Sequence, residues 1–238
     1  MLATGTITVG EHVVTTKILG LQVNLDIVWM SVIAAIIVLG LGFAVRARAT
    51  KGVPGKLQLA YETIIEQIRE VADSSIGEQG KRFVPVALMI FLFVLVCNWF
   101  EIIPNNGHDW PPPPTGDVNL PLALALLVIV WVHIESVKAR GLKGYLKHYA
   151  QPYTAMLPIN IIEEITKPIT LTFRLFGNIF SGSLMVVVMA SLLPWYASLV
   201  GQLIWKPFDL FIGLIQAFIF GLLTLIYFGM AMAPLEDH

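Results

Sequence analysis

Long runs of residues without a charged side chain are the feature that most limits how this chain can fold. About 20 apolar residues in a helix cross the hydrocarbon core of a bilayer, and only helices or closed barrels satisfy the backbone hydrogen bonds there. The runs are too long for barrel strands, so the sequence predicts an all-α, polytopic membrane protein with about five crossing segments. The uncharged runs are residues 27–45, 83–100, 118–134 (interrupted only by His133), 175–205 and 210–235.

Composition agrees with a bilayer protein and excludes other classes. Of the 238 residues, 56% are hydrophobic and 13% are charged, whereas soluble domains carry about 25% charged residues. A net charge of −1 without a basic stripe argues against nucleic acid as a partner. The single cysteine, Cys97, lies in an apolar run and can form neither an internal disulfide nor a CxxC site. We therefore expect no metal and no cofactor.

The pattern predicts a single integral membrane domain over residues 1–238. A polar lead without a basic stretch precedes the first run, which favours a retained helix over a cleaved signal peptide. Residues 56–76 combine an apolar face with a charged face, as expected of an interfacial helix on the cytoplasmic surface. The first three predicted membrane helices are residues 27–45, 83–103 and 118–137.

Lysine and arginine residues predict the orientation of the chain. Seven of them lie between the first and second runs, none between the second and third, and only Lys206 between the last two. A further basic group follows the third run, from Lys138 to Lys167. We therefore place the N-terminus outside and the basic connections and the C-terminus in the cytoplasm.

Arg174 is the residue that a simple membrane anchor does not explain. It lies seven residues after Lys167 and is followed by 31 uncharged residues. A charged side chain deep in a bilayer costs about 2.5–3.5 kcal/mol on insertion scales, so its default interpretation is functional. The alternative is that Arg174, about 10 Å beyond Lys167, snorkels to the cytoplasmic headgroups.

Polar side chains on the last two runs sort by depth around this arginine, if the two runs form an antiparallel hairpin. By helical rise, the inner set lies about 15 Å from Arg174 towards the cytoplasm. On the other side, Ser183 lies about 14 Å from Arg174 towards the outside. The arrangement indicates a chain of exchangeable protons that is interrupted by a fixed cation. The inner set is Glu163 and Glu164, the central set is Asn178 and Gln216, and the outer set is Ser183 and Asp209.

Four motifs in these segments resemble the a-subunit family of F-type ATP synthases. They are residues 98–104 (NWFEIIP), 117–119 (DVN), 167–178 (KPITLTFRLFGN) and 216–220 (QAFIF) with Leu223, Thr224 and Tyr227 following. Together they cover about residues 81–232, and the region before them is similar only in general layout.

The resemblance implies a multi-pass protein of the cell membrane that translocates protons as the stator of a rotary motor. It would not be catalytic by itself, and would couple proton flow to ATP synthesis through two offset half-channels against a c-ring, separated by Arg174. Subunit b of the peripheral stalk is a further implied partner. The last two segments, about 158–193 and about 199–233, are implied to form a long tilted hairpin. The implied proton path is Glu101, Asp117, Asn119, Glu163, Glu164, Asn178, Ser183, Asp209 and Gln216.

One departure from the family pattern concerns the outer half-channel. Many relatives pair a glutamate with a histidine where this chain has Ser183 and Asp209, so Asp209 is the sole titratable group of that pair. A water-filled path then has to replace part of the relay. Other interpretations stay open: an i,i+3 pairing of Asp209 with Lys206, a packing hydrogen bond for Gln216, border positions for Glu101 and Asp117, and interfacial positions for His133 and Glu135.

Two other membrane classes are compared with this interpretation. A haem anchor needs histidine pairs inside facing spans, and only His133 lies within a span. A secondary transporter could use Arg174 as the counter-ion of a buried substrate, but the broken helices in matching halves that such proteins show are not evident. A stator would co-purify with a ring of small hydrophobic subunits, whereas a transporter would purify alone.

Overall fold

The computed structural model describes residues 15–18, 21–50, 52–103, 113–149 and 154–232. The two chain ends, on which the predicted positions of the termini depend, lie largely outside these ranges. The elements are β1 (Thr15–Ile18), β2 (Leu21–Asn24), α1 (Leu25–Arg48), α2 (Lys56–Ile76), η1 (Gly77–Phe83), α3 (Val84–Trp99), η2 (Phe100–Ile102), η3 (Pro114–Gly116), α4 (Asn119–Tyr149), η4 (Thr154–Met156), α5 (Leu157–Leu192) and α6 (Trp195–Met232).

The predicted polytopic helical fold is confirmed. Within the described residues, five helical segments are long and apolar enough to cross a membrane: α1, α3 with its flanking turns, α4, α5 and α6. The sixth helix, α2, carries the charged face that distinguished it in the sequence. The sequence did not predict β1 and β2, a short antiparallel hairpin that pairs Thr15 with Asn24.

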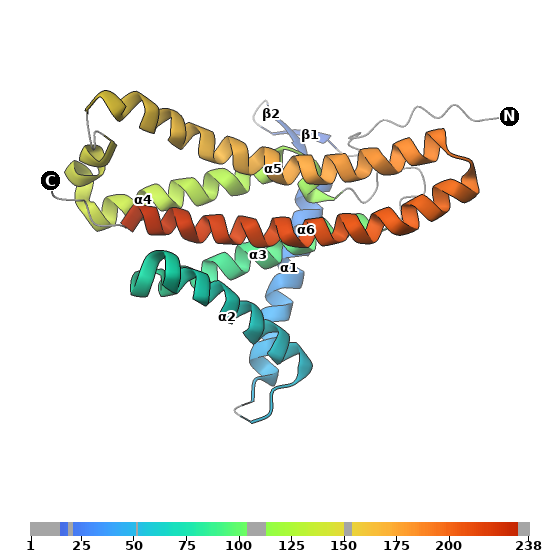
Figure 1. Ribbon diagram of the computed structural model, residues 1–238, viewed down its shortest axis with the longest axis horizontal. Coiled ribbons are helices and arrows are strands. Elements are labelled where there is room, and N and C mark those ends of the chain that lie inside the picture. Colours follow the sequence, from blue (N-terminus) through green and yellow to red (C-terminus); the bar gives the residue numbers. More distant parts are fainter. Residues whose placement is uncertain (1–14, 19–20, 51, 104–112, 150–153, 233–238) are drawn as a thin grey trace.

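The predicted long hairpin is formed by α5 and α6, which follow the long axis of the molecule while α1 crosses them (Figure 1). With 36 and 38 residues, these helices are about 54 and 57 Å long, so they must tilt steeply in a hydrocarbon core of about 30 Å. The turn between them follows from Pro194. Leu193 takes an extended conformation, as a residue before proline prefers, and α5 ends there.

Helix α4 continues further than its uncharged run predicts. It extends to Tyr149, with a break at Gly141, whose φ of 72° lies in the left-handed region. Glycine adopts this conformation without the steric cost that a Cβ brings. The break lets the basic end of α4 change direction before the chain returns to α5.

Helix α3 lies at the centre of the bundle, against α6. Phe91, Phe220 and Phe228 are among the buried side chains of this core. The two helices approach closely at Gly221, where an added Cβ would lie 3.1 Å from the carbonyl oxygen of Ala87 and 3.2 Å from the Cβ of Phe91. Small residues allow such close packing in membranes, where association depends on van der Waals contact.

We expect Gly221→Val to destabilise the bundle, because the added methyl groups would push α6 away from α3. Overpacking of this kind typically costs about 1–3 kcal/mol. The thermal unfolding temperature of the purified complex measures the effect. Gly40→Val on α1 is the matched control, since nothing lies within 4 Å of a Cβ at Gly40. Equal unfolding temperatures for the two variants would contradict the close contact.

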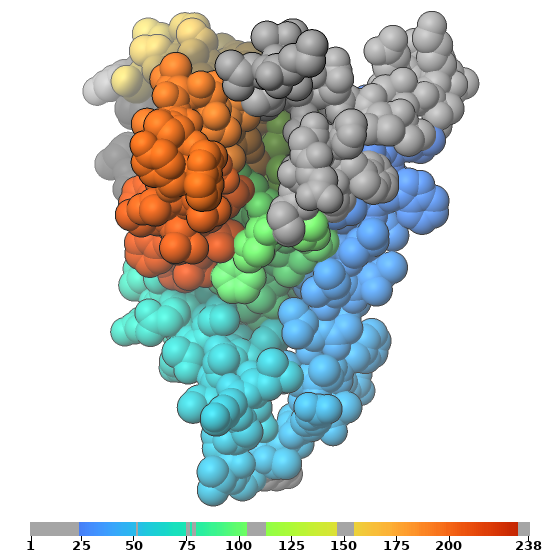
Figure 2. Space-filling model, turned by 90° about the vertical axis from the view of Figure 1, so that its right-hand side faces the viewer, coloured from blue at the N-terminus to red at the C-terminus, as the bar shows by residue number. Residues whose placement is uncertain are grey.

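A view of one end of the molecule shows that the α5–α6 turn lies apart from the lower ends of α1 and α2 (Figure 2). The turn between α5 and α6 protrudes on one side, while α1 and α2 extend away below it (Figure 2). Many apolar side chains of α1 are exposed, among them Trp29, Ile36 and Phe43. Exposed apolar residues along a helix of this length are what a lipid-facing span requires.

Candidate functional site

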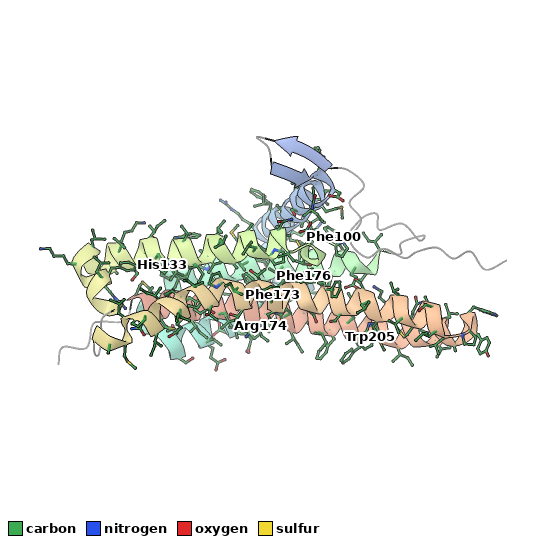
Figure 3. The ribbon with its side chains drawn as sticks, turned by 90° about the horizontal axis from the view of Figure 1, so that it is seen from above. Phe100, His133, Phe173, Arg174, Phe176 and Trp205 are labelled. Atoms are coloured by element: carbon green, nitrogen blue, oxygen red, sulfur yellow. The ribbon has the colours of Figure 1, made fainter. Side chains whose placement is uncertain are left out.

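Arg174 lies near the middle of the α5–α6 hairpin, on the side away from α4 (Figure 3). Its side chain and that of Phe173 are exposed, whereas the next residue, Leu175, is fully buried. No carboxylate of the described residues forms an ion pair with Arg174. The guanidinium group therefore lies on the surface of the hairpin, where a carboxylate of another chain could reach it.

Contacts across the hairpin fix the register of α5 against α6. The indole nitrogen of Trp205 donates a hydrogen bond to the carbonyl oxygen of Gly182 at 3.3 Å, and the Asp209 carboxyl lies directly against Gly182. Since both helices rise by the same amount per residue, continuing this antiparallel register towards the inner end brings Gln216 level with Arg174.

A polar cluster at the predicted outer level, called the outer cluster below, gathers four side chains from three elements. The Glu101 Oε1 atom lies 3.2 Å from the Lys206 Nζ atom and accepts a hydrogen bond from Ser183 Oγ at 3.3 Å. The Asp209 carboxyl lies directly against Gly182, the residue before Ser183. Asp209 is therefore not the only acid at this place, because Glu101 from η2 joins the Ser183–Asp209 pair.

The sequence analysis assigned no role in the proton path to Lys206, or to Gly182, which lies beside the cluster. Lys206 was considered only as a partner of Asp209, but its ammonium group contacts both the carboxylate and the backbone carbonyl of Glu101. Gly182 leaves room for the Asp209 carboxyl, because a Cβ at this position would overlap it. In the sequence, the feature that could have pointed to Gly182 was its small size directly before Ser183.

Buried amide side chains occupy the middle of the hairpin region. The Asn98 side chain, which is 2% exposed, donates a hydrogen bond to the carbonyl oxygen of Gly213 and accepts one from Thr115, each at 2.9 Å. Asn178 Nδ2 and Gln216 Nε2 are buried and have no hydrogen-bond partner among the described residues. Such nitrogens retain an unused capacity to donate a hydrogen bond.

The inner polar cluster connects α5 with α4. Lys167 Nζ lies 2.6 Å from Glu164 Oε1 and 3.9 Å from Glu163 Oε1, so Glu164 is its closer partner. Glu164 Oε2 in turn lies 3.7 Å from His133 Nε2, and the other ring nitrogen of His133 lies 3.5 Å from the Tyr145 hydroxyl. The Glu163 side chain is 58% exposed, whereas that of Glu164 is 25% exposed.

A cavity of about 40 Å³ adjoins this inner cluster. This volume leaves room for water, and polar side chains in the lining could bind it. The lining includes His133, Arg140, Tyr145, Glu164, Lys167 and Tyr227.

The remaining predicted path residues lie at the start of α4. Asp117 Oδ2 accepts a hydrogen bond from Asn24 Nδ2 at 2.7 Å, and Asp117 Oδ1 accepts one from the backbone nitrogen of Asn119 at 2.8 Å. These bonds tie the start of α1 to the start of α4. Elsewhere, Glu135 pairs with Arg82 and Lys138. In the part of the chain that the structure describes, no group of three or more His, Cys, Asp or Glu side chains could hold a metal ion.

Comparisons with known proteins agree with the family that the motifs resemble. The family described as ATP synthase A chain matches residues 27–229. Proteins named ATP synthase subunit a are similar over nearly the whole chain. The one from Acidothermus cellulolyticus is 47% identical over 94% of this chain and 83% of its own length, and the one from Mycobacterium marinum is 45% identical over 98% and 96%. The one from Vibrio cholerae is 35% identical over 91% and 87%. This multi-pass membrane protein therefore belongs to the ATP synthase A chain family.

Proposed function

We propose that this chain is the proton-translocating stator subunit of the Fo sector of an ATP synthase, and that it forms two offset half-channels against a c-ring. The observation that carries the proposal is the position of Arg174. It is an exposed cation without a partner carboxylate in the described residues, and it lies between two polar clusters on one long hairpin.

The outer half-channel would begin at Asp117 and Asn119 and lead to the cluster of Glu101, Ser183 and Asp209. These carboxyl and hydroxyl groups can exchange protons with water and with each other. The unused amide nitrogens of Asn178 and Gln216 would then face water or the carboxylate of the rotor at the central level. Protons would thus reach the ring from the outside through these groups and the water between them.

The inner half-channel would use the cavity beside Glu164 and lead towards Glu163, which is open to solvent. A carboxylate next to a water-sized space can release a proton without a protein partner at each step. The three charged groups of this cluster on α5, Glu163, Glu164 and Lys167, would lie on the cytoplasmic side in the proposed orientation.

Arg174 would separate the two half-channels. A guanidinium group does not lose its proton in proteins, so it cannot pass a proton from one side to the other. Its positive charge favours the ionised form of a rotor carboxylate that approaches it, and this releases the proton on the inner side. A lysine at this position could deprotonate when desolvated and would make the barrier leak.

The wider assembly follows from this role. The chain would have no catalytic activity of its own and would lie in the cell membrane as a single domain with its N-terminus outside and its C-terminus in the cytoplasm. Helix α2 would lie on the cytoplasmic surface. Subunit b of the peripheral stalk would hold the chain against the force that the ring exerts.

Co-purification tests the proposed function directly. We expect the mildly solubilised chain to retain a ring of small hydrophobic subunits, which mass spectrometry of the intact complex identifies. Cysteines placed at Asn178 and at the level of the rotor carboxylate should crosslink on oxidation, whereas cysteines at Val187 or Ile129 should not. A chain that purifies alone and is labelled at position 178 only by lipid probes would favour a transporter instead.

A further inference from the structure

One face of α4 carries a row of exposed apolar side chains that ends at an exposed lysine. Leu127, Val130 and Ile134 follow one another at helical spacing, and each is about half exposed. Lys138 comes four residues after Ile134, so it lies on the same face about one turn further on. Its side chain is 65% exposed. A face that changes from apolar to basic within one turn marks the level at which a span leaves the hydrocarbon.

A second basic side chain reaches this level from another element. Arg82 of η1 lies 3.2 Å from the Glu135 carboxylate, and Lys138 lies 2.8 Å from the same carboxylate. The Glu135 side chain is the most buried of the three, whereas those of Arg82 and Lys138 are mostly exposed. Two exposed cations therefore share one shielded carboxylate, and a positive charge remains in excess on the surface.

The part of α4 beyond the break at Gly141 adds both charge and apolar area. Leu142 and Leu146 lie one turn apart and are 64% and 60% exposed, and Lys143 beside them is exposed as well. Within the described residues, Lys143 forms no ion pair. Helical segments that expose leucines next to lysines lie in the plane of the membrane interface, with the apolar side chains in the lipid.

These five side chains, Arg82, Lys138, Leu142, Lys143 and Leu146, form what we call the α4-end surface. Its chemistry selects among possible partners. A free phosphate ion would meet the cations but would leave the leucines in water. An anionic phospholipid carries a negative headgroup and apolar chains in one molecule. The surface presents the same two properties in the same order, since its cations lie directly beyond the lipid-facing row of α4.

We propose that the α4-end surface binds anionic phospholipids. The headgroup phosphate contacts Arg82, Lys138 and Lys143, and the acyl chains lie along the apolar row that ends at Ile134. Basic side chains directly beyond a membrane helix attract such headgroups, and the attraction is lost beyond a Debye length. The inference does not rest on the proposed function, because it requires only that α4 crosses the membrane.

The test uses the purified chain with the subunits that stay bound to it, reconstituted into vesicles. A bimane fluorophore on Leu142→Cys reports the neighbouring lipid, in a complex whose other accessible cysteines are replaced. Cys97 of this chain is fully buried. Two kinds of vesicle contain the same amounts of phosphatidylglycerol and phosphatidylcholine, and differ only in which of the two lipids carries bromine on its acyl chains.

Brominated phosphatidylglycerol should quench the fluorophore more strongly than brominated phosphatidylcholine. We expect a preference of about fivefold for each cation that contacts the headgroup. Lys138→Gln together with Lys143→Gln should make the two lipids nearly equal. Arg48→Gln together with Lys56→Gln is the matched control. It removes the same charge from two exposed side chains at the far end of α2, about 30 Å from η1 by helical rise, and should keep the preference.

Equal quenching by the two lipids in the unmodified complex would overturn the proposal. A preference that falls equally in both double variants would also overturn it, since it would reflect only the total charge of the protein. Weak quenching by both lipids would mean that another protein covers the surface. A preference that disappears when inorganic phosphate is added at constant ionic strength would assign the cations to a free anion instead.

A single substitution covers the case in which the first double variant does not assemble. Lys143→Gln alone should lower the preference about fivefold, and it removes an exposed side chain without breaking an ion pair of the described residues. Lys143→Arg should retain the preference, because it keeps the charge. An unchanged preference in Lys143→Gln would contradict the proposed contact.

Discussion

ATP synthesis driven by a proton gradient should fall to background when Arg174 is replaced by alanine. The exposed guanidinium group in the middle of α5 is then lost, and no other cation of the described hairpin lies at its level. A rotor carboxylate would no longer be held ionised as it passes, and protons could cross between the two sides without turning the ring. Synthesis and passive proton leak in membrane vesicles measure both consequences.

A lysine at position 174 should restore synthesis only poorly, because an ammonium group can lose its proton when it is desolvated. Ser191→Ala on the same helix is the matched control, since within the described ranges the Ser191 hydroxyl bonds only to the backbone oxygen of Val188. Coupled synthesis at the parental rate in the alanine variant would remove the barrier role from Arg174.

Asp209→Asn should slow proton uptake from the outer side about 100-fold, which is within the usual range for loss of an acid–base group. The amide keeps the shape of the side chain beside Gly182 but carries no exchangeable acid proton. Assembly should therefore be intact, and the amount of ring bound to the chain checks this. Proton uptake into vesicles after an imposed potential gives the rate.

A second substitution sharpens this result. Ser183→Glu in the Asp209→Asn background should recover part of the rate, since Ser183 lies 3.3 Å from Glu101 and a glutamate there returns a second acid to the cluster. Ser198→Ala on α6 is the control, because Ser198 is also buried but its hydroxyl bonds only to Gln202 in the described residues. An Asp209→Asn enzyme that takes up protons at the parental rate would reduce Asp209 to a packing residue.

The membrane helices could be predicted from the sequence because lipid imposes a simple rule on backbone polar groups. A helix must cross in one piece, and a run such as residues 27–45 has no other stable conformation in hydrocarbon. The depth order of Glu164, Arg174 and Asp209 could be predicted for the same reason, since helical rise converts sequence distance into position.

Contacts between distant segments could not be predicted in this way. Lys206 and Glu101 are separated by 105 positions in the sequence. Each lies at the border of an uncharged run, where a charged side chain is normally expected to lie at the membrane–water interface without a partner in the protein. Their meeting depends on how α3 packs against α6, which is set by small residues such as Gly213 and Gly221. The β-hairpin before α1 was missed because two four-residue strands give too short a pattern.

The steep course of α5 and α6 has a geometric consequence for any ion that uses this protein. Glu164 and Gly182, which mark the inner and outer clusters, are about 27 Å apart along α5 by helical rise. In an upright helix this length would be nearly the whole thickness of the membrane. In a steeply inclined helix, most of this length runs parallel to the membrane plane. Each water-accessible path then needs to cross only part of the membrane thickness. In the proposed function, the inclination of the hairpin thus converts depth into lateral distance, and the rotor would have to turn through that distance to carry a proton from one cluster to the other.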